Sequence, residues 1–320
     1  MPVMLLDSLV GQRVVLRYRR TAATAGPAFS DVVGELISVE DDTATVSARR
    51  GQVTLRRSDI AVVRAVAANR GEILELERIS RRGWRAREVT DLDGWELHAD
   101  RGWTGRANSV LPLRTPGRPV AELLAEAGRF YAERGLPLQV QLPLPARGLL
   151  DAELAGRCWR IERPTIMLTR SLTQRWPDEP LASTAELHAE PSPEWLAAYH
   201  YRGGRLPGHA IELLTRHDRV RFAAVTRDGR VVGIARGTVD EGWLGVTAVE
   251  VAPEHRRAGV ATDLMLALQS WAGGEGASRC YLQVDSANTP ATALYQRLGF
   301  TEHHRYHYRI EPGAAEPTGS

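Results

Sequence analysis

The chain has 320 residues, of which 25% are charged and 43% hydrophobic, and its formal net charge is +2. This composition excludes an intrinsically disordered protein, and the length predicts two or three domains. No apolar run approaches the roughly 20 residues of a membrane-spanning helix, and the N-terminus lacks the basic flank and long apolar stretch of a signal peptide. We therefore expect a cytoplasmic protein without membrane contact.

The cysteine and lysine contents limit the kinds of bonds and metal sites that this chain can form. Cys158 and Cys280 are the only cysteines, which excludes a disulfide framework and disfavours a cysteine-based zinc site, so we expect no metal. All 41 basic residues are arginine, so no lysine can form a Schiff base or accept an acyl group. The near-neutral charge also disfavours strong, sequence-independent binding of polyanions.

Residues 1–66 are predicted to form a small all-β barrel of SH3-like type. Short runs rich in β-branched residues alternate there with turn signals. The predicted strands are 14–16, 32–39, 44–48 and 52–55. Such modules often bind peptides or nucleic acid, and arginine pairs such as Arg49-Arg50 suit a nucleic-acid surface. Acidic residues nearly balance these arginines, however, which favours a solvated face.

From Asn69 onward helical and strand patterns alternate in two series. We call residues 70–170 the first lobe and residues 194–312 the second lobe; a proline-containing linker is predicted at 171–193 and a disordered tail at 313–320. The first lobe has predicted helices at 72–82, 120–134 and 148–156 and predicted strands at 94–97, 107–113, 138–142 and 159–169. The second lobe has predicted helices at 194–201, 210–215, 258–272 and 290–298 and predicted strands at 221–226, 231–239, 243–251, 280–285 and 304–310. Similar strand–helix–strand phrases in both lobes suggest two copies of one α/β unit.

A strand, a short loop and a helix follow one another in residues 249–265 of the second lobe. Small residues at the start of this helix let a ligand approach the main chain, and free N–H groups at a helix N-terminus bind anions such as pyrophosphate. Arg256 adds positive charge at the same place. The six residues that keep an N–H there are Arg257, Ala258, Gly259, Val260, Ala261 and Thr262.

A second motif lies about 30 residues downstream, with Asn288, Ala291, Leu294-Tyr295 and Leu298-Gly299-Phe300. Together the two motifs resemble the GCN5-related N-acetyltransferase (GNAT) superfamily over about residues 194–310. The resemblance implies an α/β (α+β) GNAT fold, a mixed sheet flanked by helices, and acetyl transfer from acetyl-CoA to an amine. It further implies that the loop from Arg256 to Thr262 binds the pyrophosphate, that Asn288 contacts the pantetheine, and that Tyr295 lies near the thioester sulfur.

The catalytic roles follow from the chemistry of thioester aminolysis. The resemblance implies that main-chain N–H groups on the strand Val249–Val251 polarise the carbonyl. Tyr295 is the candidate acid for the thiolate, or else a core tyrosine. Glu250 is the candidate base, although strand alternation can turn it away from the acceptor, and a base relayed through water is the alternative.

The first lobe resembles a degenerate GNAT lobe. Three of the eight residues before its helix, at the place of the pyrophosphate loop, are Pro112, Pro116 and Pro119, and proline lacks the N–H that the anion needs. We therefore expect this lobe to bind no coenzyme A productively and to shape the acceptor pocket. Trp95, Trp103 and Asn108-Ser109 are candidates to line that pocket, with a purely structural role as the alternative.

The order of barrel, degenerate lobe and active lobe resembles actinobacterial histone-acetyltransferase-like proteins, and the pair of lobes is similar to the mycothiol synthases. Three hypotheses remain open. The acceptor is a protein lysine or N-terminal amine, or it is a small-molecule amine as in a mycothiol synthase. Alternatively the chain is a non-catalytic acyl-CoA sensor or scaffold, which Tyr295 and the intact loop disfavour.

Overall fold

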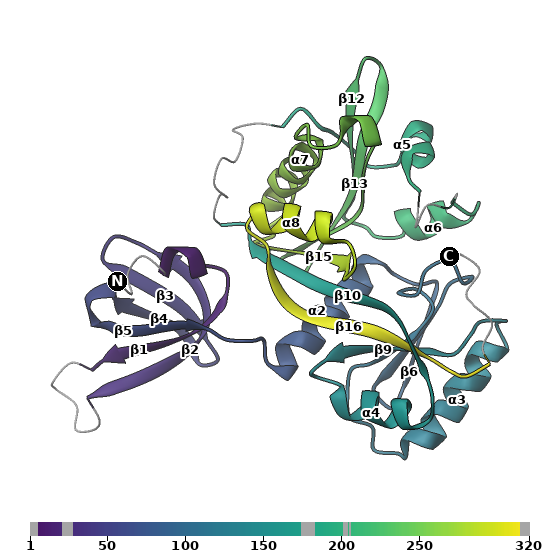
Figure 1. The fold of residues 1–320 in the computed structure, drawn as a ribbon, viewed down its shortest axis with the longest axis horizontal. Helices are drawn as coiled ribbons and strands as arrows, with labels where there is room; N and C mark the ends of the chain where they lie inside the picture. Colours follow the sequence, from purple (N-terminus) through teal and green to yellow (C-terminus); the bar gives the residue numbers. More distant parts are fainter. Residues whose placement is uncertain (1–5, 21–27, 174–182, 201–203, 205, 314–320) are drawn as a thin grey trace.

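A computed structural model describes residues 6–20, 28–173, 183–200, 204 and 206–313. A small β domain stands at one side of two larger lobes, which lie one above the other (Figure 1). Within these ranges no helix is both long enough and apolar enough to span a membrane.

The N-terminal domain is a five-stranded antiparallel sheet. Its strands are β1 (Arg13–Arg19), β2 (Phe29–Val39), β3 (Thr43–Ala48), β4 (Gly51–Arg56) and β5 (Ile60–Ala65), in the order β4-β3-β2-β1-β5. Alternate side chains such as Val14, Leu16 and Val46 are fully buried, as the period-2 pattern predicts for a sheet with one covered face. The expected small all-β domain is confirmed, with β5 as a strand beyond the four that the sequence located.

The two lobes share one sheet whose eleven described strands follow the order β11-β12-β13-β14-β15-β10-β16-β9-β8-β7-β6. The strands are β6 (Glu88–Leu92), β7 (Trp95–Ala99), β8 (Val110–Pro112), β9 (Gln139–Leu144), β10 (Arg160–Ser171), β11 (Glu186–His188), β12 (Val220–Arg227), β13 (Arg230–Asp240), β14 (Trp243–Val251), β15 (Arg279–Asp285) and β16 (Thr301–Ile310). The helices are α2 (Arg70–Gly83), α3 (Val120–Ala132), α4 (Gly148–Gly156), α5 (Pro193–Ala198), α6 (Ala210–Thr215), α7 (Val260–Gly274) and α8 (Thr289–Arg297).

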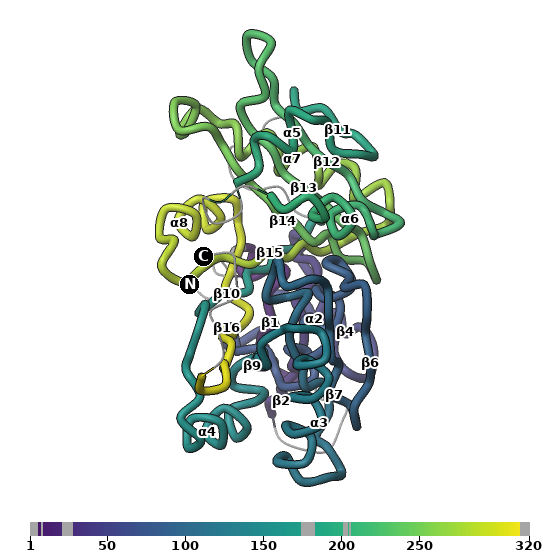
Figure 2. The backbone as a smooth tube through the Cα atoms, turned by 90° about the vertical axis from the view of Figure 1, so that its right-hand side faces the viewer, coloured from purple at the N-terminus to yellow at the C-terminus, as the bar shows by residue number. Residues whose placement is uncertain are grey.

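The strand order shows an internal repeat. In the first lobe β6, β7 and β8 are followed by α3, a parallel partner β9, then α4 and β10; in the second lobe β12, β13 and β14 are followed by α7, a parallel partner β15, then α8 and β16. The last strand of each series is exchanged. β10 lies between β15 and β16 of the second lobe, and β16 pairs in turn with β9 of the first. Figure 2 shows these two strands between the lobes.

Buried side chains also cross between the lobes. Ile166 and Leu168 of β10 belong to the core formed by α7, α8 and the second-lobe strands. A second core joins Trp84 and Trp103 of the first lobe to α5, α6 and the opposite face of the sheet, and α2 packs on β10, β14 and β15 through Leu76 and Ile79. The two lobes are therefore parts of one packed body.

The structure differs from the sequence-based expectation at two points. Glu186–His188, inside the predicted linker 171–193, form β11 and pair with β12 at the sheet edge, so this piece belongs to the sheet. The strand β6 was not predicted, because its polar, exposed residues lack an apolar alternation. Residues 174–182 of the linker and 314–320 of the predicted tail lie outside the described residues.

Strand exchange predicts that the lobes unfold together. Leu168→Ala should remove about 2–5 kcal/mol from the free energy of unfolding, because it leaves a cavity in the second-lobe core. Native-state hydrogen exchange should then accelerate equally at Val140 of the first-lobe core and Leu264 of the second. The control Leu149→Ala, at a side chain 92% exposed, should change little. Unaltered protection at Val140 would show that the lobes are independent.

Candidate functional site

The sheet of the second lobe opens between its two parallel central strands. β14 and β15 pair from Trp243↔Arg279 to Val246↔Leu282, and the pairing stops there although β14 continues to Val251 and β15 to Asp285. Each strand stays paired on its outer side, β14 with β13 and β15 with β10. The inner edge of β14 beyond Val246 therefore presents main-chain N–H and C=O groups without a strand partner to a wedge-shaped opening.

A bulge in β14 lies at the mouth of this opening. The register with β13 shifts between Ile234↔Glu250 and Arg236↔Thr247, so Ala248 and Val249 together oppose Ala235. Ala248 has φ 53°, in the left-handed region that is uncommon for a residue with a side chain. Bulges of this kind re-aim the neighbouring residues and are frequent beside active sites.

The loop before α7 presents main-chain N–H groups at the edge of the opening. Arg257 and Gly259 both have positive φ, 61° and 80°, and Gly259 is the N-cap of α7. The first amide of α7 that makes a helical hydrogen bond is that of Asp263, which donates to Gly259 O at 3.0 Å. No acceptor among the described residues is found for the six amides from Arg257 to Thr262. Arg256 and Arg257 are exposed beside them, so the loop is a ready anion site.

Tyr295 lies on the α7 and α8 face of the sheet. Its ring is 6% exposed, meets Phe300 edge-on at 5.8 Å between centroids, and belongs to the same core as Val260. Val249 and Val251 pack against this core. Burial raises the pKa of the Tyr295 hydroxyl above its ordinary value, so the group keeps its proton at neutral pH.

Asn288 starts α8 and has a structural task of its own. Its side-chain oxygen accepts from the amide of Ala291 at 3.1 Å, which makes it the N-cap of the helix that positions Tyr295. The residue is exposed, and no partner among the described residues is found for its side-chain amide nitrogen. That group can still donate to a ligand that passes α8.

Strand alternation places Glu250 on the face opposite to Val249 and Val251, which pack on the core of α7 and α8. Helices α5 and α6 cover that opposite face of the sheet (Figure 1). The main-chain N–H of His200 donates to its Oε1 at 2.8 Å, and the imidazole Nδ1 of His200 is 3.5 Å from Oε2. Burial raises the pKa of the Glu250 carboxyl, while His200 limits the shift. His200 was missed from the sequence because nothing in its local pattern links it to a strand 50 residues away.

The first lobe fills its own equivalent of the anion loop. Asp93, in the β6–β7 turn, accepts from the amides of Gly117 and Arg118 at 2.7 and 3.1 Å, just before α3. A carboxylate of the chain thus occupies N–H groups at the place where the second lobe leaves them free. This adds to the three prolines a second reason why the first lobe offers no pyrophosphate site.

The two tryptophans that were predicted to line the acceptor pocket lie in different hydrophobic cores. Trp95 is buried in the first-lobe core, whereas Trp103 lies in the shared core on the Glu250 face, with Trp84 at 5.9 Å and Tyr199 at 6.3 Å between ring centroids. Only Trp103 is therefore placed to shape a pocket beside Glu250.

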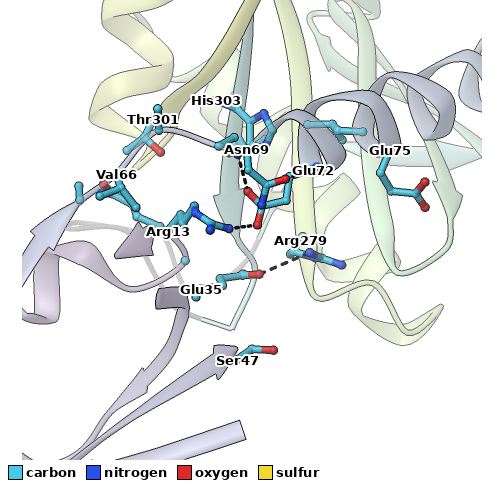
Figure 3. A pocket seen from close by; sticks show the side chains of 18 of the residues that line it. Arg13, Glu35, Ser47, Val66, Asn69, Glu72, Glu75, Arg279, Thr301 and His303 are labelled. Atoms are coloured by element: carbon cyan, nitrogen blue, oxygen red, sulfur yellow. Dashed lines mark hydrogen bonds and ion pairs between the residues drawn. The ribbon is translucent and has the colours of Figure 1, made fainter. Parts of the chain in front are cut away.

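The N-terminal domain meets the lobes across a polar cleft of about 900 Å³ (Figure 3). Arg13 pairs with Glu72 of α2, and Glu35 pairs with Arg279 at 3.4 Å. Arg279 begins β15, whereas the sheet opening lies toward Asp285 at the other end, roughly 20 Å away at 3.3 Å per residue. The cleft and the opening are separate features.

Comparison with known proteins assigns both parts of the chain. Residues 70–309 match the family model described as "Probable histone acetyltransferase Rv0428c C-terminal", and residues 8–64 match the "Rv0428c N-terminal Sm-like domain". The probable histone acetyltransferase Rv0428c of Mycobacterium tuberculosis is 32% identical over 93% of this chain and 94% of its own length. A mycothiol acetyltransferase of Thermobispora bispora is 30% identical over 68% of this chain and 76% of its own. A solved GCN5-related N-acetyltransferase from Kribbella flavida shares the fold, with TM-score 0.59, 20% identity, and coverage of 76% of this chain and 96% of that one.

The environment of Glu250 predicts a pH-dependent stability. A carboxyl whose folded pKa is raised stabilises the fold below its unfolded pKa, and this contribution is lost as pH rises through the folded pKa. Glu250→Gln, which keeps an oxygen acceptor for the His200 amide, should therefore raise the melting temperature at pH 8. The gain should shrink toward pH 4. Calorimetric scans at both pH values test this, and a lower melting temperature at pH 8 would contradict it.

Proposed function

Because this chain belongs to the GNAT acetyltransferase family, in the group of the probable histone acetyltransferase Rv0428c, we propose that its second lobe transfers the acetyl group of acetyl-CoA to an amine. The observation that supports this most is the opening between β14 and β15, together with the free amides at the start of α7. One feature suits a thioester that must reach into the sheet, and the other suits a pyrophosphate that must stay at its edge.

The residues present fit acetyl-CoA along its length. The amides from Arg257 to Thr262 would hold the pyrophosphate. The side chains of Arg256 and Arg257 would add full positive charges to the partial positive charge of the helix N-terminus. The side-chain amide of Asn288 would donate to the pantetheine. Main-chain N–H groups of Val249 and Val251, on the open edge of β14, would donate to the thioester carbonyl, where negative charge develops.

The two proton transfers of the reaction would use residues on opposite faces of the opening. Glu250, on the α5 and α6 face, would take the proton of the attacking amine, directly or through water, as the new C–N bond forms. Tyr295, on the other face, would donate its hydroxyl proton toward the sulfur as the C–S bond breaks. The raised pKa of Tyr295 makes it a hydrogen-bond donor first, stabilising the thiolate, and a proton source second.

Two classes of acceptor amine fit this site. A protein lysine or N-terminal amine accords with the name of the Rv0428c relative and with the added Sm-like domain; a small-molecule amine accords with the mycothiol acetyltransferase relative. We propose a protein amine, because the N-terminal domain has its own core and gives a macromolecule a second place to bind. Such an acceptor would have to span the roughly 20 Å between the cleft and the opening.

Gly259→Trp should abolish acetyl-CoA binding, because the indole would cover the free amides. Gly259→Ala introduces the same strain at φ 80° without the bulk, and no atom lies within 4 Å of its added Cβ, so it should keep most of the affinity. Titration calorimetry of both variants checks this. Equal affinities for the two variants would exclude the loop as the pyrophosphate site.

Tyr295→Phe should lower kcat by roughly 10²-fold, the lower end for one positioned acid since a thiolate is a good leaving group, and leave the affinity for acetyl-CoA unchanged. The ring contact with Phe300 is retained, so the fold should be too. Tyr131→Phe is the matched control, because that buried hydroxyl donates to His98 O in the first lobe. Stopped-flow detection of free thiol gives the rate. An unchanged kcat would show that the Tyr295 hydroxyl takes no part in catalysis and that the residue only packs in the core.

A chain that begins at Ala67 should fold and bind acetyl-CoA, because the N-terminal core contains no residue from the lobes. If the acceptor is a protein, this truncation should reduce acetylation of protein substrates far more than acetylation of small amines. Equal losses on both would argue for a small-molecule acceptor, and an insoluble chain would place the domain boundary elsewhere. Circular dichroism and a coenzyme A release assay provide both readouts.

A further inference from the structure

The first lobe contains a cavity of about 480 Å³ that the acetyl-transfer site does not use. It lies between the loop that follows β8 and the start of α4, and it reaches the N-terminus of α2. Among the described residues that line it are three arginines, Arg70, Arg114 and Arg147, and one acid, Glu153, which pairs with Arg157 at 2.9 Å. Arg114 pairs with Asp91 at 3.5 Å, so Arg70 and Arg147 are the lining cations without an ion-pair partner among the described residues.

Arg147 is the buried one of these two arginines. It is 6% exposed, and its hydrogen bonds among the described residues are to two main-chain carbonyls, of Pro112 and Ala146. Its Nη2 is buried without a hydrogen-bond partner among the described residues, and so is Nε1 of Trp95, another lining residue. Burial and the nearby charge of Arg70 lower the pKa of Arg147 to about 10. A carboxylate in the cavity would supply the ion-pair partner that Arg147 and Arg70 lack among the described residues.

The other walls are apolar. Val120 of α3, Leu150 of α4 and Pro116 line the cavity, and Leu149 at its rim is 92% exposed. Pockets of this size with an apolar lining and a few converging polar groups are typical of small-molecule sites. The donors select an anion, and guanidinium groups match the geometry of a carboxylate.

We propose that this cavity binds a small amphipathic monocarboxylate, with its carboxylate at Arg147 and Arg70 and an apolar chain of about six to ten carbons along Val120, Leu149 and Leu150. The site is separate from the anion loop of the second lobe. It is also unsuited to coenzyme A, since Asp93 already occupies the amides of Gly117 and Arg118 before α3.

The test uses octanoate as the probe, titrated by calorimetry into the full chain saturated with coenzyme A, which fills the second-lobe site. One octanoate should bind. 1-Octanol, which lacks the charge, and inorganic phosphate, which lacks the chain, should each bind at least about tenfold more weakly. Intermolecular nuclear Overhauser effects should connect octanoate to the methyl groups of Val120, Leu149 and Leu150.

Two variants localise the site without disturbing buried contacts. Leu149→Glu places a negative charge, like that of the carboxylate, at the exposed rim, and Arg70→Gln removes a cation that donates to the Thr115 hydroxyl. Each should weaken octanoate binding about five- to tenfold. Arg129→Gln, a charge loss at an exposed residue of α3 outside the cavity, should not. Absence of octanoate binding, equal affinity in Leu149→Glu and the unmodified chain, or contacts elsewhere would overturn the proposal. Tighter binding of phosphate than of octanoate would overturn it as well.

Discussion

The antiparallel pair β10 and β16 is the interaction on which the rest of the structure depends. Each strand ends one α/β series and completes the sheet of the other, so neither lobe has a closed sheet alone. The consequence reaches the opening between β14 and β15. β15 is fixed by seven residue pairs with β10, from Thr165↔Asp285 to Ser171↔Arg279. Its other edge can then stay unpaired toward β14 without collapsing, so donors are held in place before a ligand arrives.

The two copies of the repeat differ at the loop before α7 in the second lobe and the corresponding loop before α3 in the first lobe. In the second lobe Arg257 and Gly259 turn the chain so that six amides stay free. In the first lobe Asp93 reaches back to two of the corresponding groups, and prolines remove others. The second lobe keeps its main-chain donors available, whereas the first lobe satisfies two of them internally and has a cavity lined by arginine, tryptophan and apolar side chains. The two copies of the repeat therefore differ in which main-chain donors stay free within one sheet.

The structural features that could be predicted from the sequence are those set by neighbouring residues. The turn at Asp228-Gly229, the strand Trp243–Val251 and the helix after Gly259 follow from short patterns of apolar, glycine and β-branched residues, and the structure has all three. The contacts that complete the site are distant in sequence. Glu250 meets His200, 50 residues away, and β10 meets β15 over more than 100 residues, so no local pattern records either. The edge strand β11 was hidden because pairing with β12, rather than composition, makes it a strand.

If the six free amides at the start of α7 hold an anion, as proposed, they link the lifetime of the whole chain to the supply of that anion. A group that binds only the folded form stabilises it by mass action, by about 2.7 kcal/mol when its concentration is a hundred times its dissociation constant. Because β10 and β16 tie the cores together, an anion held at this one loop protects both lobes against unfolding and against proteases. In a cell the abundance of this protein would then rise and fall with the supply of that anion, apart from any change in its synthesis.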